Sequence, residues 1–420
     1  MTMYRVGDEI LEKDSDQFEA KLAAIHGSRE RPVCLCRADG IEMYVVRLDG
    51  RHFIKRMPNT GGDHDPSCGS YEPPAELSGL GQVMGTAIVE NPDIGTTALK
   101  LQFSLTKASG RAAPCPGDGE GDSVKTDGNK LSLRALLHFL WDEAGFQKWS
   151  PAMHGKRNWG VLRKYLLLAA QHKNTKGSEL SDILYIPEPF SVERKEGIAQ
   201  RRTAQLSRIA EGYGQMGTRK LMVLIAEVKE IAPSRSGYKL IAKHLNDFHF
   251  LMNPDLHKRL LKRFDVEMSL AASTEGTHLL AVATFGVNKA GVASIEEIGL
   301  MVTTDNWIPF ESLSEKNLID SLSRYGRRFV KGLRYNLANT RPLAAAVLTD
   351  TQVPTAMYIH PPGAGDEYGV ALEELVDGSK MASWIWHPDQ GEMPPLPHAG
   401  ATPNGFARES HTGRVPRQAG

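Results

Sequence analysis

The chain has 420 residues, of which 24% are charged, and its 50 basic and 50 acidic side chains cancel at neutral pH. A chain of this length is too long to fold around one hydrophobic core, so we expect two or three domains. The balanced charge excludes a protein that binds polyanions through its overall charge, so a nucleic-acid role would need local patches. The N-terminus lacks the apolar segment of a secretory signal, and no apolar run is long enough to span a membrane. With only four cysteines, the chain is not a disulfide scaffold, and we expect a cytoplasmic protein without membrane contact.

The first 107 residues predict a β-rich N-terminal domain. Short strands are expected over residues 31–36, 41–48 and 51–57. Asp49-Gly50 favours a tight hairpin between the last two strands. Because these two strands have similar lengths, the chain runs out and back to the same level. The loop "NTGGDHDPSC" after the hairpin can therefore fold over the end of the first strand.

Three cysteines and one histidine in this region form a candidate metal site. Three thiolates and one imidazole are a ligand set of closed, tetrahedral structural zinc sites, and soft sulfur ligands favour Zn²⁺ over Mg²⁺ or Ca²⁺. The sequence thus predicts a zinc-ribbon-like β-meander over residues 31–75, with the ligands Cys34, Cys36, His64 and Cys68. His52 is the alternative imidazole. Ordinary buried thiols or a redox pair are the alternatives without a metal.

Side chains near these ligands can tune the site. We expect Asp63 or Asp65 to orient His64, as carboxylates often do for metal-bound histidines. The negative charge of three thiolates can be offset by a nearby cation, for which the candidates are Arg37, Lys55 and Arg56. A closed site with four protein ligands has no open position for water, so it contributes folding energy rather than catalysis.

The rest of the chain divides by composition and period. Residues 108–130 are rich in Gly, Pro, Asp and Ser and predict a flexible linker, with Cys115 as an isolated exposed thiol. Residues 131–180 predict two helices in a winged-helix-like segment, and residues 181–392 predict a mixed α/β domain. Residues 393–420 have few apolar side chains and predict a disordered tail. The expected fold class is α+β.

Two basic segments without any acid, residues 151–178 and 321–349, are candidates for nucleic-acid contact. Arginines at helical spacing beside aromatic residues suit phosphate contact and base stacking. The alternative is a solvated helix face whose charges are balanced by acids elsewhere in the chain. The candidate residues are Lys156, Arg157, Arg163, Lys164, Arg327, Arg328, Lys331 and Arg334.

A weaker pattern suggests a metal-dependent nuclease. Glu227 and Lys229 follow the apolar run "LMVLIA" in the acid-x-lysine spacing that can place a carboxylate for Mg²⁺ and a lysine near the attacking water. Asp182 is the candidate for the second carboxylate. The alternative is that Glu227 and Lys229 are ordinary surface residues on one solvent face, because a strand alternates its side chains.

Cys34, Cys36 and Cys68, together with the stretches "WIPFES", "RRFVKGLRYNL" and "AVLTDTQVPTAMYI", carry a family resemblance. The sequence resembles the uncharacterised bacterial domain-of-unknown-function family 1173, which has three N-terminal cysteines, over residues 30–390. The resemblance implies a bacterial setting, often on integrating or conjugative elements, and it implies no activity.

The leading functional hypothesis is therefore a zinc-binding, nucleic-acid-associated protein of a mobile element, with DNA or RNA and other mobile-element proteins as partners. The alternatives are a metal-dependent nuclease and a non-catalytic protein–protein adaptor. The sequence alone predicts neither a substrate nor an oligomeric state.

Overall fold

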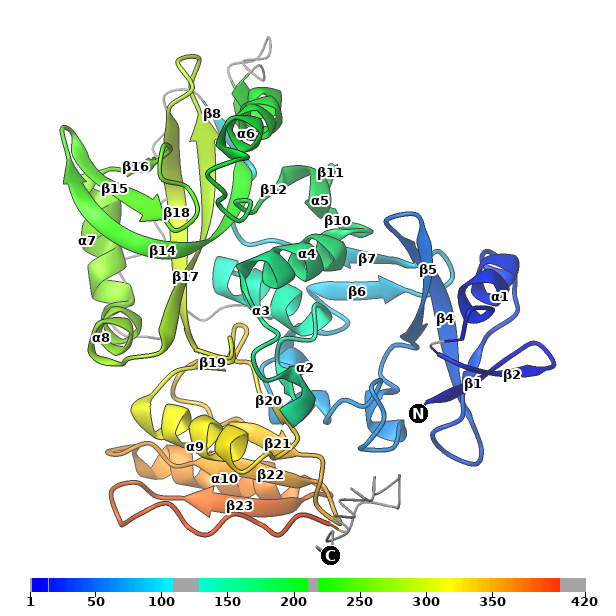
Figure 1. Ribbon diagram of the computed structural model, residues 1–420. Coiled ribbons are helices and arrows are strands. Elements are labelled where there is room, and N and C mark those ends of the chain that lie inside the picture. Colours follow the sequence, from blue (N-terminus) through cyan, green and yellow to red (C-terminus); the bar gives the residue numbers. More distant parts are fainter. Residues whose placement is uncertain (1, 14, 109–127, 211–217, 401–420) are drawn as a thin grey trace, which may run out of the picture.

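The structure is a computed structural model that describes residues 2–13, 15–108, 128–210 and 218–400 (Figure 1). Helices and strands are mixed along these ranges, which confirms the α+β class at the level of secondary structure. An N-terminal sheet lies at one side, a β-barrel at the other and a C-terminal sheet below, with helices between them (Figure 1). Within the described ranges, none of the helices combines the length and the apolar character needed to cross a bilayer.

The N-terminal sheet contains the three strands predicted around the cysteines. Its order is β2-β1-β3-β4-β5, and each neighbouring pair is antiparallel. Asp49 (φ 49°) and Gly50 (φ 79°) form the predicted two-residue turn, because both adopt the left-handed conformation that this kind of turn requires. Helix α1 (Phe18–Ile25) covers the sheet (Figure 1). The strands are β1 (Met3–Val6), β2 (Glu9–Glu12), β3 (Val33–Cys34), β4 (Ile41–Leu48) and β5 (Arg51–Arg56).

A second sheet joins the N-terminal part to the predicted helical segment. Its order is β11-β10-β7-β6, and β10 runs parallel to β7. The two predicted helices are α3 (Leu133–Glu143) and α4 (Trp159–Ala170), which begin at the capping side chains Ser132 and Asn158. The strands are β6 (Ile88–Asn91), β7 (Thr96–Leu99), β10 (Lys173–Thr175) and β11 (Ser178–Glu179). Short helices in this half are η1 (Gly61–Asp63), η2 (Ala75–Leu77), α2 (Leu80–Val83), η3 (Pro151–Met153) and α5 (Leu180–Ile183).

The third sheet closes into a barrel. Its order is β12-β14-β15-β16-β18-β17, and β14 also pairs with β17. The first half of β14 pairs with β17 and its second half pairs with β15, with a bulge between Val228 and Glu230. The barrel strands are β14 (Met222–Ser234), β15 (Gly237–Ala242), β16 (Phe250–Met252), β17 (Thr277–Val287) and β18 (Ala293–Thr304). Strands β12 (Leu184–Tyr185) and β19 (Pro309–Phe310) extend it, and helices α6 (Lys195–Ala210), α7 (Pro254–Arg263) and α8 (Asp265–Ser273) flank it. Strands β8 (Thr106–Ala108) and β13 (Thr218–Lys220) form a separate pair.

The C-terminal sheet has the order β23-β22-β21-β20-β9. Its pairs are antiparallel except for β22 and β23, which are parallel and joined by helix α10 (Asp366–Asp377). Helix α9 (Leu313–Arg324) comes directly before the strand β20 in the chain. The edge strand β9 comes from the chain between α3 and α4, so this sheet also draws on a distant segment. The strands are β9 (Lys148–Trp149), β20 (Phe329–Lys331), β21 (Ala346–Leu348), β22 (Thr355–Ile359) and β23 (Ala382–Trp386).

The predicted start of the disordered tail is wrong. Residues 393–400 are packed, because Met393 and Leu396 contact the core beneath the C-terminal sheet. The Trp384 indole N–H donates to the carbonyl of Pro395 at 3.0 Å. Prolines lack a backbone donor but keep their carbonyl oxygen, which side chains of the folded body can reach. Residues 401–420 lie outside the described residues, as do residues 109–127, which include Cys115 and most of the predicted linker.

Candidate metal centre

The four predicted metal ligands come from one strand and one loop. Cys34 lies in β3, where it pairs with Tyr4 of β1 and Ile41 of β4, and Cys36 follows two residues later. The loop after β5 carries His64 and Cys68 past the short helix η1. The loop closes on itself because the Glu72 N–H donates to the Gly61 carbonyl at 3.1 Å.

A close backbone approach makes glycine necessary in this loop. A Cβ atom on Gly61 would lie 2.8 Å from the Cβ of Glu72, which is closer than two carbon atoms can stay. Gly61 is buried at this crossing. The glycine at this position of the "TGG" sequence therefore allows the backbones at the two ends of the loop to approach each other closely.

The four side chains converge as predicted. One ligand atom from each of Cys34, Cys36, His64 and Cys68 lies within 4.8 Å of all the others. The Cys34 and Cys68 sulfurs are 3.8 Å apart, and the His64 Nδ1 is 3.3 Å from the Cys36 sulfur and 3.8 Å from the Cys68 sulfur. A tetrahedral ion with metal–sulfur bonds of about 2.3 Å and metal–nitrogen bonds of about 2.0 Å would separate two sulfurs by about 3.8 Å, and sulfur from nitrogen by about 3.5 Å. These side chains could therefore hold a metal ion, with His64 binding through Nδ1.

Backbone donors favour the thiolate form that a metal requires. The Asp65 N–H points at the Cys36 sulfur and the Ser70 N–H at the Cys68 sulfur, each at 3.5 Å. The hydrogen bond between Cys34 and Cys68 lowers the pKa of Cys68 and raises that of Cys34, because one thiolate accepts the proton of the other thiol. The donor set is thus sulfur-rich, and Cys68 is the thiol whose pKa is lowered, whereas burial raises the pKa of Cys36.

The expected orientation of His64 by a carboxylate is wrong. The Asp65 carboxylate accepts from the N–H and hydroxyl of Ser67 at 2.9 and 2.6 Å. Asp63 contributes only its backbone carbonyl, which accepts from the Arg37 Nε at 2.9 Å. The Nε2 of His64 is buried and has no hydrogen-bond partner among the described residues. The ring is held instead by its packing and its Nδ1 contacts with sulfur.

Two other residues considered near the site, His52 and Lys55, lie elsewhere. The ring of His52 packs against that of His26, with centroids 5.0 Å apart, so His64 and not His52 joins the cysteines. Lys55 forms an ion pair with Glu143 of the body. Arg37 and Arg56 stay beside the loop, because Arg37 donates to the Asp63 carbonyl and Arg56 pairs with Glu72.

The loop that carries His64 and Cys68 is tied to the body of the molecule. The Lys148 Nζ, in β9, donates to the carbonyls of Gly69 and Tyr71, both at 2.9 Å. The same Nζ lies 3.8 Å from the carboxylate of Glu72 at the end of the loop. These contacts begin one residue after Cys68, so the position of the loop and the position of the metal ligands are coupled.

A cluster of buried charged side chains forms a second contact, between the N-terminal sheet and helix α3. The Glu143 carboxylate pairs with Lys55 of β5 and Lys173 of β10, each at 2.6 Å. Burial alone would raise the pKa of Glu143, but the two ammonium groups hold it well below its usual range. The sequence predicted no role for Glu143 and placed Lys173 only among the cations of the basic segment 151–178. Their separation from Lys55 by about a hundred residues left no local signal.

The three candidate nuclease residues are not brought together. Glu227 is only 3% exposed and accepts from the Nδ1 of His278 at 2.7 Å and from the Nζ of Lys243 at 2.5 Å. The alternative view of Glu227 as an ordinary surface residue is therefore also wrong. Lys229 is exposed at the bulge of β14.

Strand register separates Asp182 from Glu227. Leu184 pairs with Val223, which is four residues before Glu227 on β14, or about 13 Å along a strand. Asp182 is exposed in α5 on the far side of that pairing. The sequence could not identify His278 as the partner of Glu227, because only the pairing of β14 with β17 brings it near.

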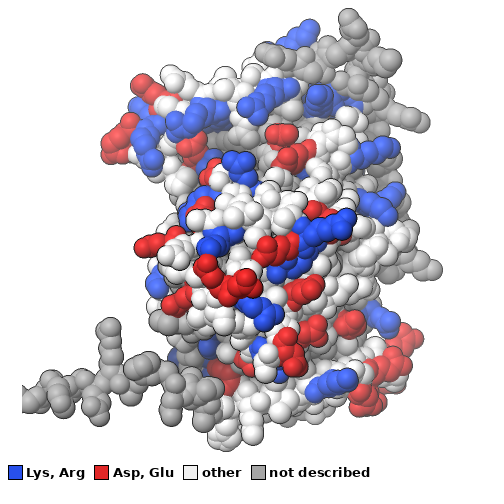
Figure 2. Space-filling model, turned by 90° about the vertical axis from the view of Figure 1, so that its right-hand side faces the viewer, with Lys and Arg blue, Asp and Glu red and all other residues white. Residues whose placement is uncertain are grey.

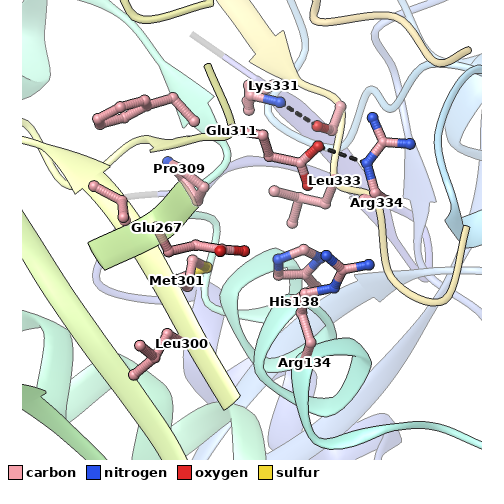
Figure 3. A pocket seen from close by; sticks show the side chains of 13 residues that line it. Arg134, His138, Glu267, Leu300, Met301, Pro309, Glu311, Lys331, Leu333 and Arg334 are labelled. Carbon is pink, nitrogen blue, oxygen red and sulfur yellow. Dashed lines mark hydrogen bonds and ion pairs between the residues drawn. The ribbon is translucent and has the colours of Figure 1, made fainter. Parts of the chain in front are cut away.

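Three of the four candidate cations of the second basic segment are neutralised inside the molecule. Arg327 pairs with Asp350 at 2.7 Å, Lys331 with Glu315 at 2.8 Å, and Arg334 with Glu311 at 2.5 Å. Figure 3 shows Glu311 against Arg334 in a pocket that Lys331 also lines. The acid-free segment thus takes its counter-charges from other parts of the chain, which local sequence does not show.

The first basic segment is also partly internal. The Arg157 guanidinium donates to the carbonyls of Phe146 at 2.9 Å and Asn306 at 3.2 Å, and burial lowers its pKa to about 10. The Arg163 Nε donates to the carbonyl of Ile186 at 3.0 Å. Of the eight candidates, the exposed cations without an ion pair among the described residues are Lys156, Lys164 and Arg328. The candidates do not form one basic face, and Figure 2 shows acidic and basic side chains interspersed over much of the face it presents.

Comparison with known proteins gives one finding. A family model described as "Protein of unknown function (DUF1173)" matches residues 4–389. The comparison with curated proteins and the comparison with solved structures each gave no match. Because the family model covers nearly the whole chain and the three cysteines converge with His64, the chain belongs to this family of unknown function, DUF1173.

Proposed function

We propose that the chain binds one Zn²⁺ ion through Cys34, Cys36, His64 and Cys68, and that this ion is structural. The observation that carries the proposal is the mutual spacing of the four ligand atoms, which is that of a tetrahedral site. Three sulfurs favour zinc over the hard cations Mg²⁺ and Ca²⁺. Four protein ligands complete the coordination, so no position remains for a catalytic water.

The ion would hold the loop 61–72 in the shape that contacts the body. Cys34 and Cys68 lie in the small core of the N-terminal sheet with Phe18, Leu22 and Met43. The loop itself has few apolar side chains, and its contacts with the body use Gly69, Tyr71 and Glu72. Zinc binding therefore supplies the free energy that fixes this loop, and with it the junction between the N-terminal sheet and the body.

Metal content tests the proposal directly. We expect elemental analysis of the purified full chain to give one zinc per chain, and Cys34→Ser or Cys68→Ser to reduce this to a small fraction. Cys115→Ser is the matched control, because it removes the fourth cysteine of the sequence and should keep the zinc. A native protein without a stoichiometric transition metal, or equal zinc in all three variants, would contradict the proposal.

The other functional hypotheses from the sequence are not part of this proposal. The separation of Asp182 from Glu227 removes the support for the nuclease. The ion pairs of Arg327, Lys331 and Arg334 weaken the nucleic-acid surface at those residues. The mobile-element setting, the adaptor role and the cytoplasmic location stay predictions.

A further inference from the structure

The barrel has a distinctive topology. Its five strands close in the order β14-β15-β16-β18-β17, and β17 returns to β14. All pairs are antiparallel except β16 with β18. In chain order, helices α7 and α8 lie between the third strand, β16, and the fourth strand, β17. The long first strand, β14, pairs with both the second strand, β15, and the fourth. This is the arrangement of a five-stranded Greek-key barrel of the oligonucleotide/oligosaccharide-binding type.

One side of the barrel packs against the rest of the molecule and the other does not. Val223 and Ile225 of β14, with Leu280 and Val282 of β17, belong to the core shared with α3 and α4. Strands β15 and β16 and helix α7 lie at the opposite edge of the molecule (Figure 1). In barrels of this type, the second and third strands and the first hairpin loop form the ligand face. Here those elements are β15, β16 and the β14–β15 hairpin.

This outer side carries cations without counter-charges. We call it the barrel face and define it by Arg235, Lys239, Lys258 and Lys262. Arg235 is exposed in the β14–β15 hairpin, Lys239 lies on β15, and the two other lysines are exposed one turn apart on α7. None of the four forms an ion pair with the part of the chain that the structure describes. They differ in this respect from Arg327, Lys331 and Arg334, which are all paired.

The start of β15 packs against the start of α7. The ring of Tyr238 in β15 stacks on that of His257 in α7, with centroids 3.4 Å apart and planes 11° from parallel. Gly237 (φ 139°) brings the hairpin against the start of α7, since a Cβ there would lie 2.6 Å from the Met252 carbonyl oxygen. Tyr238 and His257 are half-buried, and Tyr238 lies on the face of β15 that packs on the barrel core, whereas Lys239 lies on the opposite, outer face.

We propose that the barrel face binds single-stranded nucleic acid, with the four cations contacting phosphates. Barrels of this type bind oligonucleotides along this face, and a groove that follows one phosphate backbone favours a single strand over a duplex. No base-specific donor or acceptor set is needed, so the expected binding is tolerant of sequence. DNA and RNA share this chemistry. The inference does not depend on the metal site, which lies in the N-terminal sheet.

Fluorescence anisotropy with the full chain tests the barrel face. The probes are labelled oligothymidylate and oligouridylate of about 20 nucleotides, longer than the site of one such barrel, and a duplex of the same length. We expect single strands to bind more tightly than the duplex. The logarithm of the binding constant should fall with the logarithm of salt concentration with a slope of about −3, since each phosphate contact to a single strand contributes about −0.7.

The variant Arg235→Gln/Lys239→Gln/Lys258→Gln should weaken binding and reduce the slope by about 2. The matched control is Lys164→Gln/Arg328→Gln, which removes two exposed cations of the surface predicted from sequence and should leave binding unchanged. Full binding by the triple variant, loss of binding by the control, or equal affinity for the duplex would overturn the inference.

Discussion

Asp142 shows how burial changes the chemistry of a single residue. Its carboxylate lies in α3 and accepts from the hydroxyl of Tyr335 at 2.7 Å and from the amide of Gln147. Burial, with the nearby negative charge of Glu72, raises the pKa of Asp142 to about 7. The Gln147 Oε1 is buried and has no partner among the described residues, so the site has more acceptors than donors. A proton on Asp142 would relieve this excess if the Gln147 amide turned to accept it.

The contribution of Asp142 to the stability of the protein should therefore decline as the pH rises from 4 to 7. In this window the folded protein holds a proton on Asp142 that the unfolded chain, with a pKa near 4, has lost. Each unit of this difference is worth about 1.4 kcal/mol. Two groups act in the opposite direction: Glu311, held at a pKa of about 2 by Arg334 against the effect of its burial, below pH 5, and His138, whose pKa burial lowers to about 3, up to about pH 6.5. The parent protein alone therefore does not isolate the Asp142 contribution, and the comparison with a variant at this position does.

Urea unfolding of the full chain at several pH values between 4 and 8 checks this prediction. Asp142→Asn mimics the protonated carboxyl and should remove the decline, so that the variant is more stable than the parent protein at pH 8. The surface variant Asp305→Asn is the control, because that side chain is 84% exposed. An Asp142→Asn protein that keeps the parent's pH profile would show that Asp142 is ionised throughout.

At the level of elements, the segment after the metal loop connects the N-terminal half to the C-terminal sheet. The Gly79 N–H donates to the carbonyl of Leu333 at 2.9 Å, and the Ala344 N–H donates to the carbonyl of Leu77 at 2.8 Å. A Cβ on Gly79 would lie 1.8 Å from the backbone oxygen of Arg334. The two backbones cross so closely that only glycine fits at this position.

We expect Gly79→Ala to destabilise the protein by about 1–3 kcal/mol, because the added methyl group forces the two backbones apart. Gly369→Ala is the matched control. It lies in α10 with no atom near its added Cβ, and should stabilise the helix by up to about 1 kcal/mol. Denaturant unfolding midpoints measure both effects. Equal stability of the two variants would mean that the crossing between residues 79 and 334 is looser than the structure has it.

At the level of the whole molecule, the metal site and the largest cores lie in different places. The ligands sit in the small core of the N-terminal sheet, while the barrel and the helices α3 and α4 have extensive cores of their own. The junction between them is polar and includes the buried pairs of Glu143 with Lys55 and Lys173. Loss of the metal should therefore unfold one region before the rest, as local stability differs across a structure.

Hydrogen exchange before and after chelation tests this expectation. In the presence of a strong zinc chelator, amides of residues 31–72 should lose protection, while those of β14, β17 and β18 should keep it. Cys115→Ser provides a control protein with the same expected response. Uniform loss of protection would mean that the metal supports the whole fold, and unchanged exchange in residues 31–72 would remove the structural role of the ion.

The sequence by itself determined the features that depend on neighbouring residues. The Asp49-Gly50 turn, the strands on either side of it and the helices α3 and α4 follow from local propensity and period, and the structure confirms them. The convergence of the four candidate metal ligands also belongs here, because the hairpin between Cys36 and His64 returns the chain to its starting level, so short-range geometry was enough.

Only the tertiary structure decided which charged side chains stay exposed without an ion pair and which are neutralised by a partner. Arg334 pairs with Glu311 and Lys331 with Glu315, partners that are distant in the sequence. The pairing of β14 with β17 brings Glu227 to His278. The closure of the barrel depends in the same way on the pairing of β14 with β17. A local pattern reports the intrinsic character of a side chain, whereas burial and counter-charge belong to its surroundings in space. For this reason the basic residues within 327–334 predicted an exposed basic surface. In the fold, three of them form ion pairs, and cations without ion pairs lie on the barrel face.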